Sequence, residues 1–355
     1  MDSKLEDGLD AFNQEFAKYD QVEKLQRYRL SEGAEDQFDD EYVLKTCDLS
    51  EFVNGDAAGK AKFARDLGTS LEDIGFAIIT GHGVRNALYQ QARELTIDLF
   101  ENYSVESRMK FRAQRHGSVN QGYFPIKETT IIHPDLVEGW VFCRRAFDLD
   151  NDPNYKWEDY WPEARFETAF REIVTAHEKL ILPLMQSMLQ YLNVDVNTYD
   201  EKLNKTNFGF RLNYYPSLSD NAESSGGRML GHEDVDLFTI LPASEIEGLQ
   251  ALHRGSMKWV RVNAPEGSIV LNTGDYMQRI TNNRLPSTTH RVSRPQTVEL
   301  QDKPRISFPM AIYVWEDEIL EVLPGLGDPN YAPVRAEDFH TQITSKYYGD
   351  DYAKS

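Results

Sequence analysis

Cysteine is scarce in this chain of 355 residues, which contains only Cys47 and Cys143. Neither belongs to a CxxC or zinc-type spacing, so the sequence offers no thiolate zinc site, and two free thiols in a large chain fit a reducing compartment. No apolar run approaches the ~18 residues that span a bilayer, and the acidic first residues lack the apolar core of a signal peptide. These absences predict a cytoplasmic protein without a membrane partner.

Positive charge is also in short supply. The chain has 38 Lys and Arg against 58 Asp and Glu, which gives a net charge of −20 and a pI of about 4.8. Such a surface repels phosphate backbones, so we expect no nucleic-acid partner and attribute the charge mainly to solubility. The hydrophobic fraction of 40% is enough for a sizeable core. We expect a monomer or weak homo-oligomer whose partner is a small-molecule substrate.

Residues 1–40 form an acidic N-terminal extension. Within it Leu9, Phe12 and Phe16 recur at helical spacing and predict a short amphipathic helix that docks on the body. The polar stretch 31–36 is typical of a linker. We therefore expect the main body to follow this extension.

Residues 41–204 show mainly helical patterns around one predicted strand. Apolar residues three or four apart predict core-facing helices, and the apolar run 75–80 predicts a buried strand. Pro183 should kink the last helix, and His177 on its apolar face is expected to be a packed structural histidine. The predicted helices cover 63–74, 85–101 and 163–192.

Residues 205–325 consist of short β-rich runs separated by turn residues. This pattern is typical of a β-sandwich or jelly roll. Residues 326–355 follow as a C-terminal segment, and we expect 41–355 to form one compact unit of mixed α+β class. The predicted strands cover 208–215, 237–241, 249–253, 259–262, 268–271, 290–293 and 305–314.

Two histidines and one aspartate indicate a metal centre. His232 and Asp234 are two residues apart, and on a strand such residues face the same side, so both can reach one ion. His290 begins another predicted strand and adds a second imidazole. Two imidazoles and one carboxylate can cap one face of an octahedral metal and leave other positions open, which suits ferrous iron that handles dioxygen.

Other residues compete for roles at this centre. Asp236 lies on the same predicted face as Asp234, so it is a rival ligand, a group behind the ligands or a substrate contact. The same donor set also suits zinc in a hydrolase, and a binding protein without activity could retain the fold. The remaining histidines outside the long helix lie in turns, in polar loops or without a partner, and we expect them to be non-catalytic: His82, His116, His133, His253 and His340.

A buried anion site is predicted on the last strand. Arg305 and Ser307 share one face, and an inward arginine is costly unless an anion pairs with it. A guanidinium can bind a carboxylate through two bonds, so a dicarboxylic keto acid would fit between Arg305 and the metal. A surface salt bridge is the alternative. Asn213 and Tyr215 share a face of the first strand and could line the same site, although Tyr215 could equally be a core residue.

These residues carry a resemblance to a known family. The chain resembles the isopenicillin N synthase-like family of Fe(II)/2-oxoglutarate-dependent dioxygenases over roughly residues 42–325. The chain departs from the family pattern where 295–304 lengthens the gap between His290 and Arg305, and where Asp236 replaces a small residue. The matching segments are 47–50, 75–84, 121–123, 138–140, the His232-x-Asp234 pair, 272–282, 287–292 and the Arg305-x-Ser307 pair.

The resemblance implies a double-stranded β-helix (jelly-roll) core with N-terminal supporting helices. It implies Fe(II) held by His232, Asp234 and His290. It also implies 2-oxoglutarate as co-substrate, anchored by Arg305 and Ser307 with Tyr215 and Asn213 beside them.

The implied reaction uses dioxygen and 2-oxoglutarate to oxidise an unactivated C–H bond, and it releases succinate and CO2. The outcome would be hydroxylation, desaturation or oxidative cyclisation of a small specialised metabolite or an amino-acid-like compound. An iron oxidase of the same family that closes a ring without 2-oxoglutarate is the alternative. Arg279 could bind a substrate carboxylate or form a salt bridge near Asp275. The expected substrate contacts are Tyr123, Phe142, Phe210, Arg279, Asp236 and the polar loop 113–130.

Overall fold

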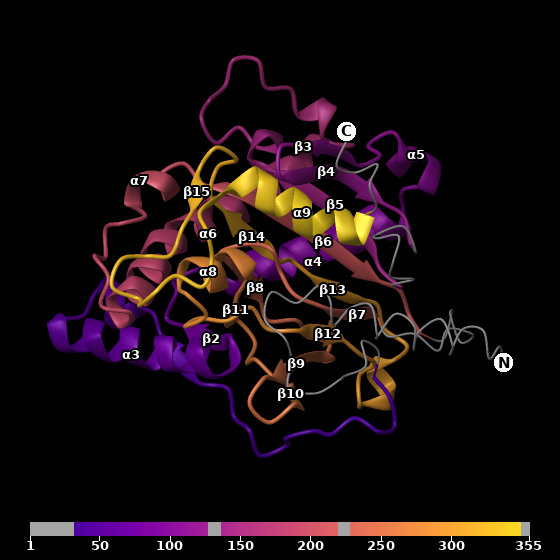
Figure 1. Cartoon of the computed structure of the whole chain (residues 1–355). Coiled ribbons are helices and arrows are strands. Elements are labelled where there is room, and N and C mark those ends of the chain that lie inside the picture. The colour runs from indigo at the N-terminus through magenta and orange to yellow at the C-terminus, as the bar shows by residue number, and fades with distance from the viewer. Residues whose placement is uncertain (1–31, 127–135, 219–227, 349–355) are drawn as a thin grey trace.

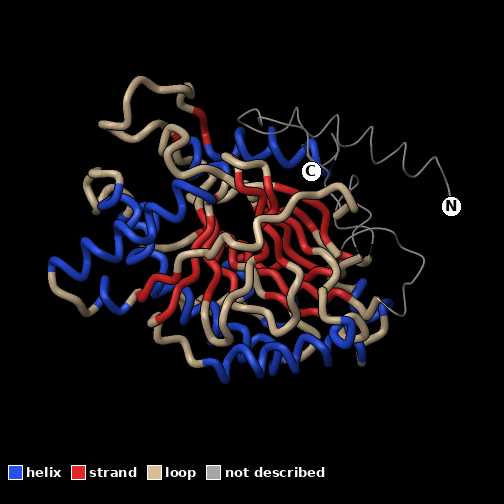
Figure 2. Tube along the Cα trace, turned by 90° about the horizontal axis from the view of Figure 1, so that it is seen from below, coloured by secondary structure: helices blue, strands red, loops and turns tan. Residues whose placement is uncertain are grey.

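The computed structural model describes residues 32–126, 136–218 and 228–348. Two β-sheets form the centre, and helices flank them on the outside (Figures 1 and 2). The amphipathic helix predicted from Leu9, Phe12 and Phe16 lies outside the described residues. No helix in the described ranges combines the length and the apolar character needed to span a membrane.

The large sheet contains ten strands and builds one wall of the core. Its path brings together strands that are far apart in sequence, because β2 lies between β1 and β11, and β6 lies between β14 and β5. The additional strand β13 (Arg305–Ser307) pairs with the end of β6. The order along the sheet is β1 (Thr46–Asp48), β2 (Phe76–Thr80), β11 (Ile269–Thr273), β8 (Phe238–Pro242), β14 (Met310–Tyr313), β6 (Asn207–Tyr215), β5 (Glu138–Cys143), β4 (Val119–Phe124) and β3 (Gln114–His116).

The small sheet contains four antiparallel strands in the order β10 (Lys258–Arg261), β9 (Leu249–His253), β12 (His290–Val292) and β7 (Met229–His232). An apolar cluster lies between the sheets, because Phe76, Ile78 and Val270 of the large sheet belong to one cluster with Ala251 and Val292 of the small sheet. A separate pair, β15 (Ile319–Leu320) and β16 (Val334–Arg335), precedes the last helix. The two facing sheets form the double-stranded β-helix that the sequence predicts.

The helices pack mainly against the outer face of the large sheet through a second, larger apolar cluster. The longest, α6 (Ala164–Tyr191), continues through Pro183, and His177 is fully buried in it beside Tyr89. The others are α2 (Ser50–Val53), α3 (Ala57–Ile74), α4 (Asn86–Glu101), α5 (Val105–Met109), α7 (Asp200–Leu203), α8 (Asp275–Ile280) and α9 (Ala336–Tyr348).

Local chemistry sets the ends of α3. The Asp56 side chain accepts a hydrogen bond from the Gly59 amide, which caps the first turn. Gly75 ends the helix with a φ of +72°, a conformation that favours glycine. A Cβ at this position would also lie 2.9 Å from the Pro286 carbonyl oxygen. Gly75 therefore lets the chain turn directly into β2.

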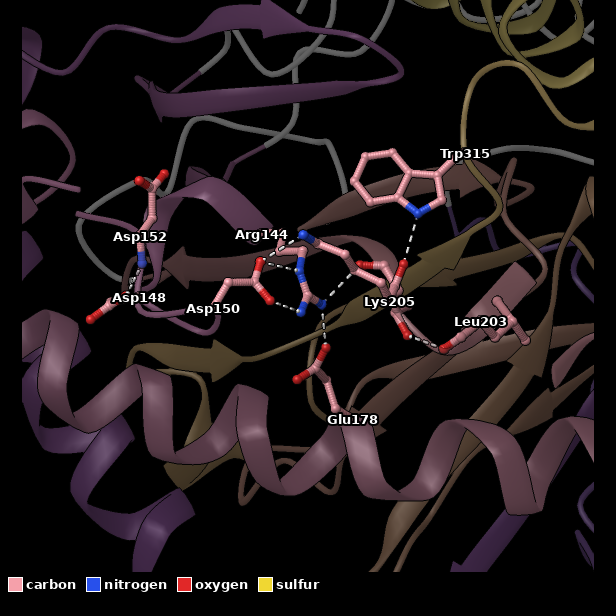
Figure 3. Close-up of polar contacts among 9 residues, drawn as sticks. Arg144, Asp148, Asp150, Asp152, Glu178, Leu203, Lys205 and Trp315 are labelled. Atoms are coloured by element: carbon pink, nitrogen blue, oxygen red, sulfur yellow. Dashed lines mark hydrogen bonds and ion pairs between the residues drawn. The ribbon is translucent and has the colours of Figure 1, made fainter. Parts of the chain in front are cut away.

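Ion pairs fix the connection between β5 and α6 (Figure 3). Arg144 follows β5, and its guanidinium contacts Glu178 of α6 at 2.6 Å and Asp150 at 3.1 Å. Lys205, just before β6, contacts the other oxygen of Asp150 at 2.9 Å. The three segments are thus tied together at the edge of the core.

Three local expectations were wrong. The described part of the predicted linker, 32–36, is not free, because the Asp36 carboxylate forms a buried ion pair with Arg291. The region 113–126 is a hairpin of β3 and β4 rather than a loop, and 127–130 lie outside the described residues. The strand predicted over 305–314 is broken at Phe308 and Pro309, because proline has no N–H to donate to a neighbouring strand.

Candidate active site

Two antiparallel strands bring His232 and His290 together. His232 is the last residue of β7, His290 is the first of β12, and the two are paired in register. One ligand atom from each histidine and one from Asp234 all lie within 4.8 Å of one another. Asp234 faces both rings, with distances of 3.7 Å to His232 Nε2 and 3.8 Å to His290 Nε2. Asp234 is not on a strand as predicted, because β7 ends at His232 and a short loop carries the carboxylate.

Backbone carbonyls orient both imidazoles. His232 Nδ1 donates to the Leu230 carbonyl at 2.9 Å, and His290 Nδ1 donates to the Thr288 carbonyl at 3.0 Å. With its proton on Nδ1, each ring presents the free electron pair of Nε2 towards Asp234. Burial, and then the neighbouring His290, lower the pKa of His232 to about 4. Both effects favour the neutral imidazole that a metal requires.

The start of α8 fixes the loop that carries Asp234. The backbone amide of Asp275 donates to the Asp234 carbonyl at 2.8 Å, and the amide of Tyr276 donates to the Asp236 carbonyl at 3.0 Å. Gly274 allows this close approach, since a Cβ there would lie 2.6 and 2.8 Å from those same carbonyl oxygens. The loop and the helix start therefore form one rigid unit.

Two hydrogen-bond donors and two histidines set the charge state of the Asp234 carboxylate. Asn272 Nδ2 donates to Asp234 Oδ2 at 2.8 Å, and Thr239 Oγ1 lies 3.0 Å from the same oxygen. Burial by itself raises the pKa of Asp234. The charges of His290 and His232 and these hydrogen bonds outweigh burial and lower the pKa below its usual value. Asp234 is consequently an anion at neutral pH.

Asp236 lies behind Asp234 rather than in the cavity. Its Oδ2 is 2.6 Å from Thr239 Oγ1, and burial together with the charge of Asp234 raises its pKa well above the usual value. The Thr239 hydroxyl has one proton for two carboxyl groups. The arrangement is satisfied when neutral Asp236 donates to Thr239 and Thr239 donates to Asp234. Within the described residues, the Thr239 side chain thus links Asp236 to Asp234.

A cavity of about 250 Å³ opens beside the three ligand residues. Arg305, Ser307, Asn213 and Tyr215 line it together, because Arg305 is paired with Tyr215 and Ser307 with Asn213 across β13 and β6. The guanidinium of Arg305 is buried; its Nε donates to the Ile246 carbonyl, and its Nη1 has no hydrogen-bond partner among the described residues. Burial lowers the pKa of Arg305, and no carboxylate of the described residues forms an ion pair with this buried cation, which is a costly arrangement.

The predicted aromatic substrate contacts face the other side of the large sheet. Tyr123, Phe142 and Phe210 lie in the core beneath the helices, and Phe142 stacks on Trp161 at a ring distance of 3.6 Å. Successive residues of a strand face opposite sides, so the neighbours of these aromatics line the cavity instead. These neighbours are Phe124, Val141, Gly209 and Arg211.

Arg279 is also absent from the cavity lining. It projects from α8, donates to the Ala332 carbonyl at 2.5 Å and lies over the rings of Tyr331 and Phe339. Its surroundings therefore give it a structural role.

One of the histidines that we expected to be non-catalytic, His340 on α9, lines the cavity. The sequence showed no partner for it, and in the structure Tyr276 is its neighbour at 3.2 Å. His133 lies outside the described residues.

Sequence reasoning missed Thr239, Asn272 and Arg211 as site residues. Asn272 begins a segment that the family resemblance includes, but nothing in one sequence shows that it reaches Asp234. Arg211 was detectable, because it lies two residues before Asn213 and so shares its face of β6.

Two family models match the chain. The 2OG-Fe(II) oxygenase superfamily model matches residues 206–312, which contain all three clustered ligand residues and Arg305. The model of the N-terminal region of the non-haem dioxygenases in morphine synthesis matches residues 44–164. The His232, Asp234 and His290 side chains fit an Fe(II) ion, and the buried guanidinium of Arg305 fits a carboxylate of 2-oxoglutarate. The chain belongs to the 2OG-Fe(II) oxygenase superfamily.

The similarity to known proteins covers most of the length of this oxygenase. It is 27% identical to the 2-oxoglutarate-Fe(II) type oxidoreductase hxnY of Emericella nidulans, over 85% of this chain and 89% of that protein. A 2OG-Fe(II) oxygenase family protein of Caulobacter crescentus has 25% identity and a TM-score of 0.72, over 86% of this chain and 99% of that chain. A full-length protein of Neurospora crassa, solved in complex with alpha-KG and 5-formyluracil, has 19% identity and a TM-score of 0.75, over 92% of this chain and 100% of that chain.

These comparisons confirm the predicted fold class and enzyme class. The protein is a non-haem Fe(II)/2-oxoglutarate-dependent oxidoreductase with a jelly-roll core. Its cofactor and co-substrates are Fe(II), 2-oxoglutarate and dioxygen.

Proposed function

We propose that this oxygenase oxidises an unactivated C–H bond of a small molecule in the cavity beside His232, Asp234 and His290. These three residues would hold Fe(II) through two imidazole nitrogens and one carboxylate oxygen, a set suited to ferrous iron in oxygenases. Bound Fe(II), together with 2-oxoglutarate and dioxygen, supplies the oxidising chemistry and yields succinate and CO2. The protein's own task is to place the substrate and exclude competing reactions.

The single observation that supports a co-substrate site is the unpaired guanidinium of Arg305. Its Nη1 is buried without a partner among the described residues, and Ser307 and Asn213 lie next to it, with Asn213 Nδ2 donating to Ser307 Oγ at 3.3 Å. We assign Arg305 and Ser307 to the distal carboxylate of 2-oxoglutarate, with Asn213 and Tyr215 completing the wall. A carboxylate there would accept charge-assisted hydrogen bonds and remove the cost of the buried cation.

Arg228 strengthens the positive field around this site. It is fully buried, and burial followed by the charge of Arg305 lowers its pKa to about 10. Two arginines with incompletely paired head groups favour an anion over a neutral ligand.

We further propose that residues 41–355 work as one unit, with 205–325 as the catalytic core, and that the outcome is hydroxylation, desaturation or cyclisation.

Anaerobic titration tests this function directly. Addition of Fe(II) and then 2-oxoglutarate under nitrogen should produce a weak visible charge-transfer band, and His290→Ala should lose it. Arg305→Met should raise the KM for 2-oxoglutarate by about 10- to 100-fold, because hydrogen bonds to a charged group are removed, while Arg305→Lys should be intermediate. Oxygen uptake without succinate release would identify an oxidase that does not use 2-oxoglutarate and would contradict the proposal.

A further inference from the structure

Arg211 is a second cation that lines the cavity, away from Arg305. It lies on β6, and its buried Nε and Nη2 atoms have no hydrogen-bond partner among the described residues. Its head group lies against the backbone of Gly139, where an added Cβ would be 2.8 Å from Nη2, and it is 6.0 Å from the centre of the Phe124 ring. A guanidinium held in place without an acceptor indicates that an acceptor arrives with a ligand.

The neighbouring acids do not supply that acceptor. Glu138, on the adjacent strand, faces the helices, where it is paired with Arg108 at 2.6 Å. Glu233 lines the cavity and accepts a hydrogen bond from Thr289 at 3.1 Å, and within the described residues no hydrogen bond or ion pair joins it to Arg211. His340, on the cavity wall, is kept neutral because burial lowers its pKa to about 3. In this part of the described cavity, Arg211 is therefore the cation that can bind an anionic ligand.

The co-substrate is poorly placed to satisfy Arg211. Tyr215, the partner of Arg305 in register, lies four residues after Arg211 on β6, which corresponds to about 13 Å along the strand. A five-carbon diacid is much shorter than this and would be anchored at the Arg305 end. Arg211 lines the same cavity as His232, Asp234 and His290, so an anion bound to it would lie close to the metal ligands.

The size of the cavity limits what can bind. Its volume of about 250 Å³ has to hold the co-substrate and the substrate together, and it is below the range of ~300–1,000 Å³ typical of pockets for drug-sized ligands. Phe124 and Val141 provide apolar wall next to Arg211. This volume argues against a substrate carried on a large group.

We propose that the substrate is a small organic acid whose carboxylate binds Arg211 while its apolar body packs on Phe124 and Val141. This assignment rests on the proposed function and adds the substrate class to it. The carboxylate would take two hydrogen bonds from the guanidinium, from Nε and Nη2, which are the two atoms left without partners among the described residues. Arg211 thereby fixes which carbon of the substrate lies nearest the metal ligands.

The test uses pairs of acids and amides with the full-length Fe(II)-loaded protein. A panel of small aromatic and aliphatic carboxylic acids is assayed beside the primary amide of each, and succinate release above the substrate-free rate is measured. We expect stimulation by acids and not by their amides. Arg211→Met should raise the KM for the stimulating acid by about 10- to 100-fold and leave the KM for 2-oxoglutarate within about twofold. Arg211→Lys should be intermediate.

Arg85→Met is the matched control, because Arg85 is exposed at the start of α4 and pairs only loosely with Glu172 at 3.9 Å. It should leave both KM values unchanged. Equal stimulation by acids and amides, no stimulation by any acid, or a KM for 2-oxoglutarate that rises with Arg211→Met as much as that for the acid would overturn the proposal. Absence of the Fe(II)–2-oxoglutarate absorption band in the wild type would instead contradict the proposed function itself.

Discussion

The Thr239 hydroxyl occupies a position between two carboxyl groups of different charge. It is 3.0 Å from Asp234 Oδ2 and 2.6 Å from Asp236 Oδ2. Because the raised pKa of Asp236 keeps that group neutral, Thr239 can donate its proton to the Asp234 carboxylate. This hydroxyl therefore orients the Asp234 carboxylate and links it to the neutral carboxyl group of Asp236.

Replacement of Thr239 tests this role in metal binding. Thr239→Val keeps the shape but removes the hydroxyl, so we expect Fe(II) affinity to fall by about 10- to 100-fold, the usual effect of losing a group behind a metal ligand. Anaerobic Fe(II) titration measures the change. Thr239→Ser retains the hydroxyl and should bind Fe(II) within a fewfold of the wild type. An unchanged affinity of the valine variant would show that Asn272 alone orients Asp234.

Individual residues also show how far prediction from one sequence reaches. The residues His232, Asp234, His290, Arg305 and Ser307 could be selected from their chemistry, their spacing and the family resemblance. The structure places all five on one cavity, and their roles stay predictions. The aromatic contacts could not be selected, because Tyr123 and Phe124 are both plausible, and a shift of one residue reverses the face of the sheet. Only the register of β4, β5 and β6 shows that Phe124 faces the cavity and Tyr123 faces the helices.

At the scale of elements, the segment 32–40 packs as an extra edge on the small sheet. Phe38 pairs with Trp259 of β10, and the Asp39 amide donates to the Trp259 carbonyl at 2.9 Å. Asp36 contacts Arg291 at 2.8 Å, and Arg291 stacks 3.7 Å above the Trp259 ring. Since Arg291 follows His290 directly, this segment supports the strand that carries a predicted metal ligand.

Loss of the Asp36 carboxylate should therefore destabilise the fold. Asp36→Ala leaves Arg291, which is 1% exposed, as a buried charge without its carboxylate, and we expect the free energy of unfolding to fall by about 3 kcal/mol. Urea unfolding of the metal-free protein measures this. Asp40→Ala in the same segment is the matched control: Asp40 is 74% exposed in its pair with Arg261, so its loss should have little effect. Equal effects of the two variants would contradict a structural role for the buried pair.

Most elements could be predicted from hydrophobic periodicity, but several could not. The helices α4 and α6 and the strands β2, β6 and β9 agree closely with the predicted ranges, whereas α3 begins at Ala57, six residues before the predicted start. The sequence did not reveal β5 or β7, because β5 contains Gly139 and Glu138, and β7 is only four residues long with Gly231 inside it. Pairing with neighbouring strands stabilises both strands, and this pairing cannot be predicted from the local pattern of hydrophobic residues.

At the scale of the whole molecule, two buried histidines lie in helices far apart in sequence. His177 on α6 contacts Tyr89 at 2.9 Å, and His340 on α9 contacts Tyr276 at 3.2 Å. Burial is the largest cause that lowers the pKa of each to about 3. In the unfolded chain each would have a pKa near 6.5, so protons bind to the unfolded state more readily than to the folded state.

This difference predicts that His177 and His340 make the folded protein less stable as the pH falls. The stability that each neutral, buried histidine contributes is fully present above about pH 6.5. It is lost progressively as the pH falls towards about 3, because the unfolded chain then binds a proton that the folded chain does not. Between about pH 7.5 and pH 5.5, each should remove about 1.4 kcal/mol from the free energy of unfolding. Urea unfolding of the metal-free protein at both pH values should therefore show a smaller loss for His177→Gln than for the wild type, by about that amount. The double variant with His340→Gln should show about twice the difference. A wild type and double variant with the same pH dependence would mean that both histidines stay neutral in the unfolded chain, or become charged in the folded one, and neither agrees with their burial.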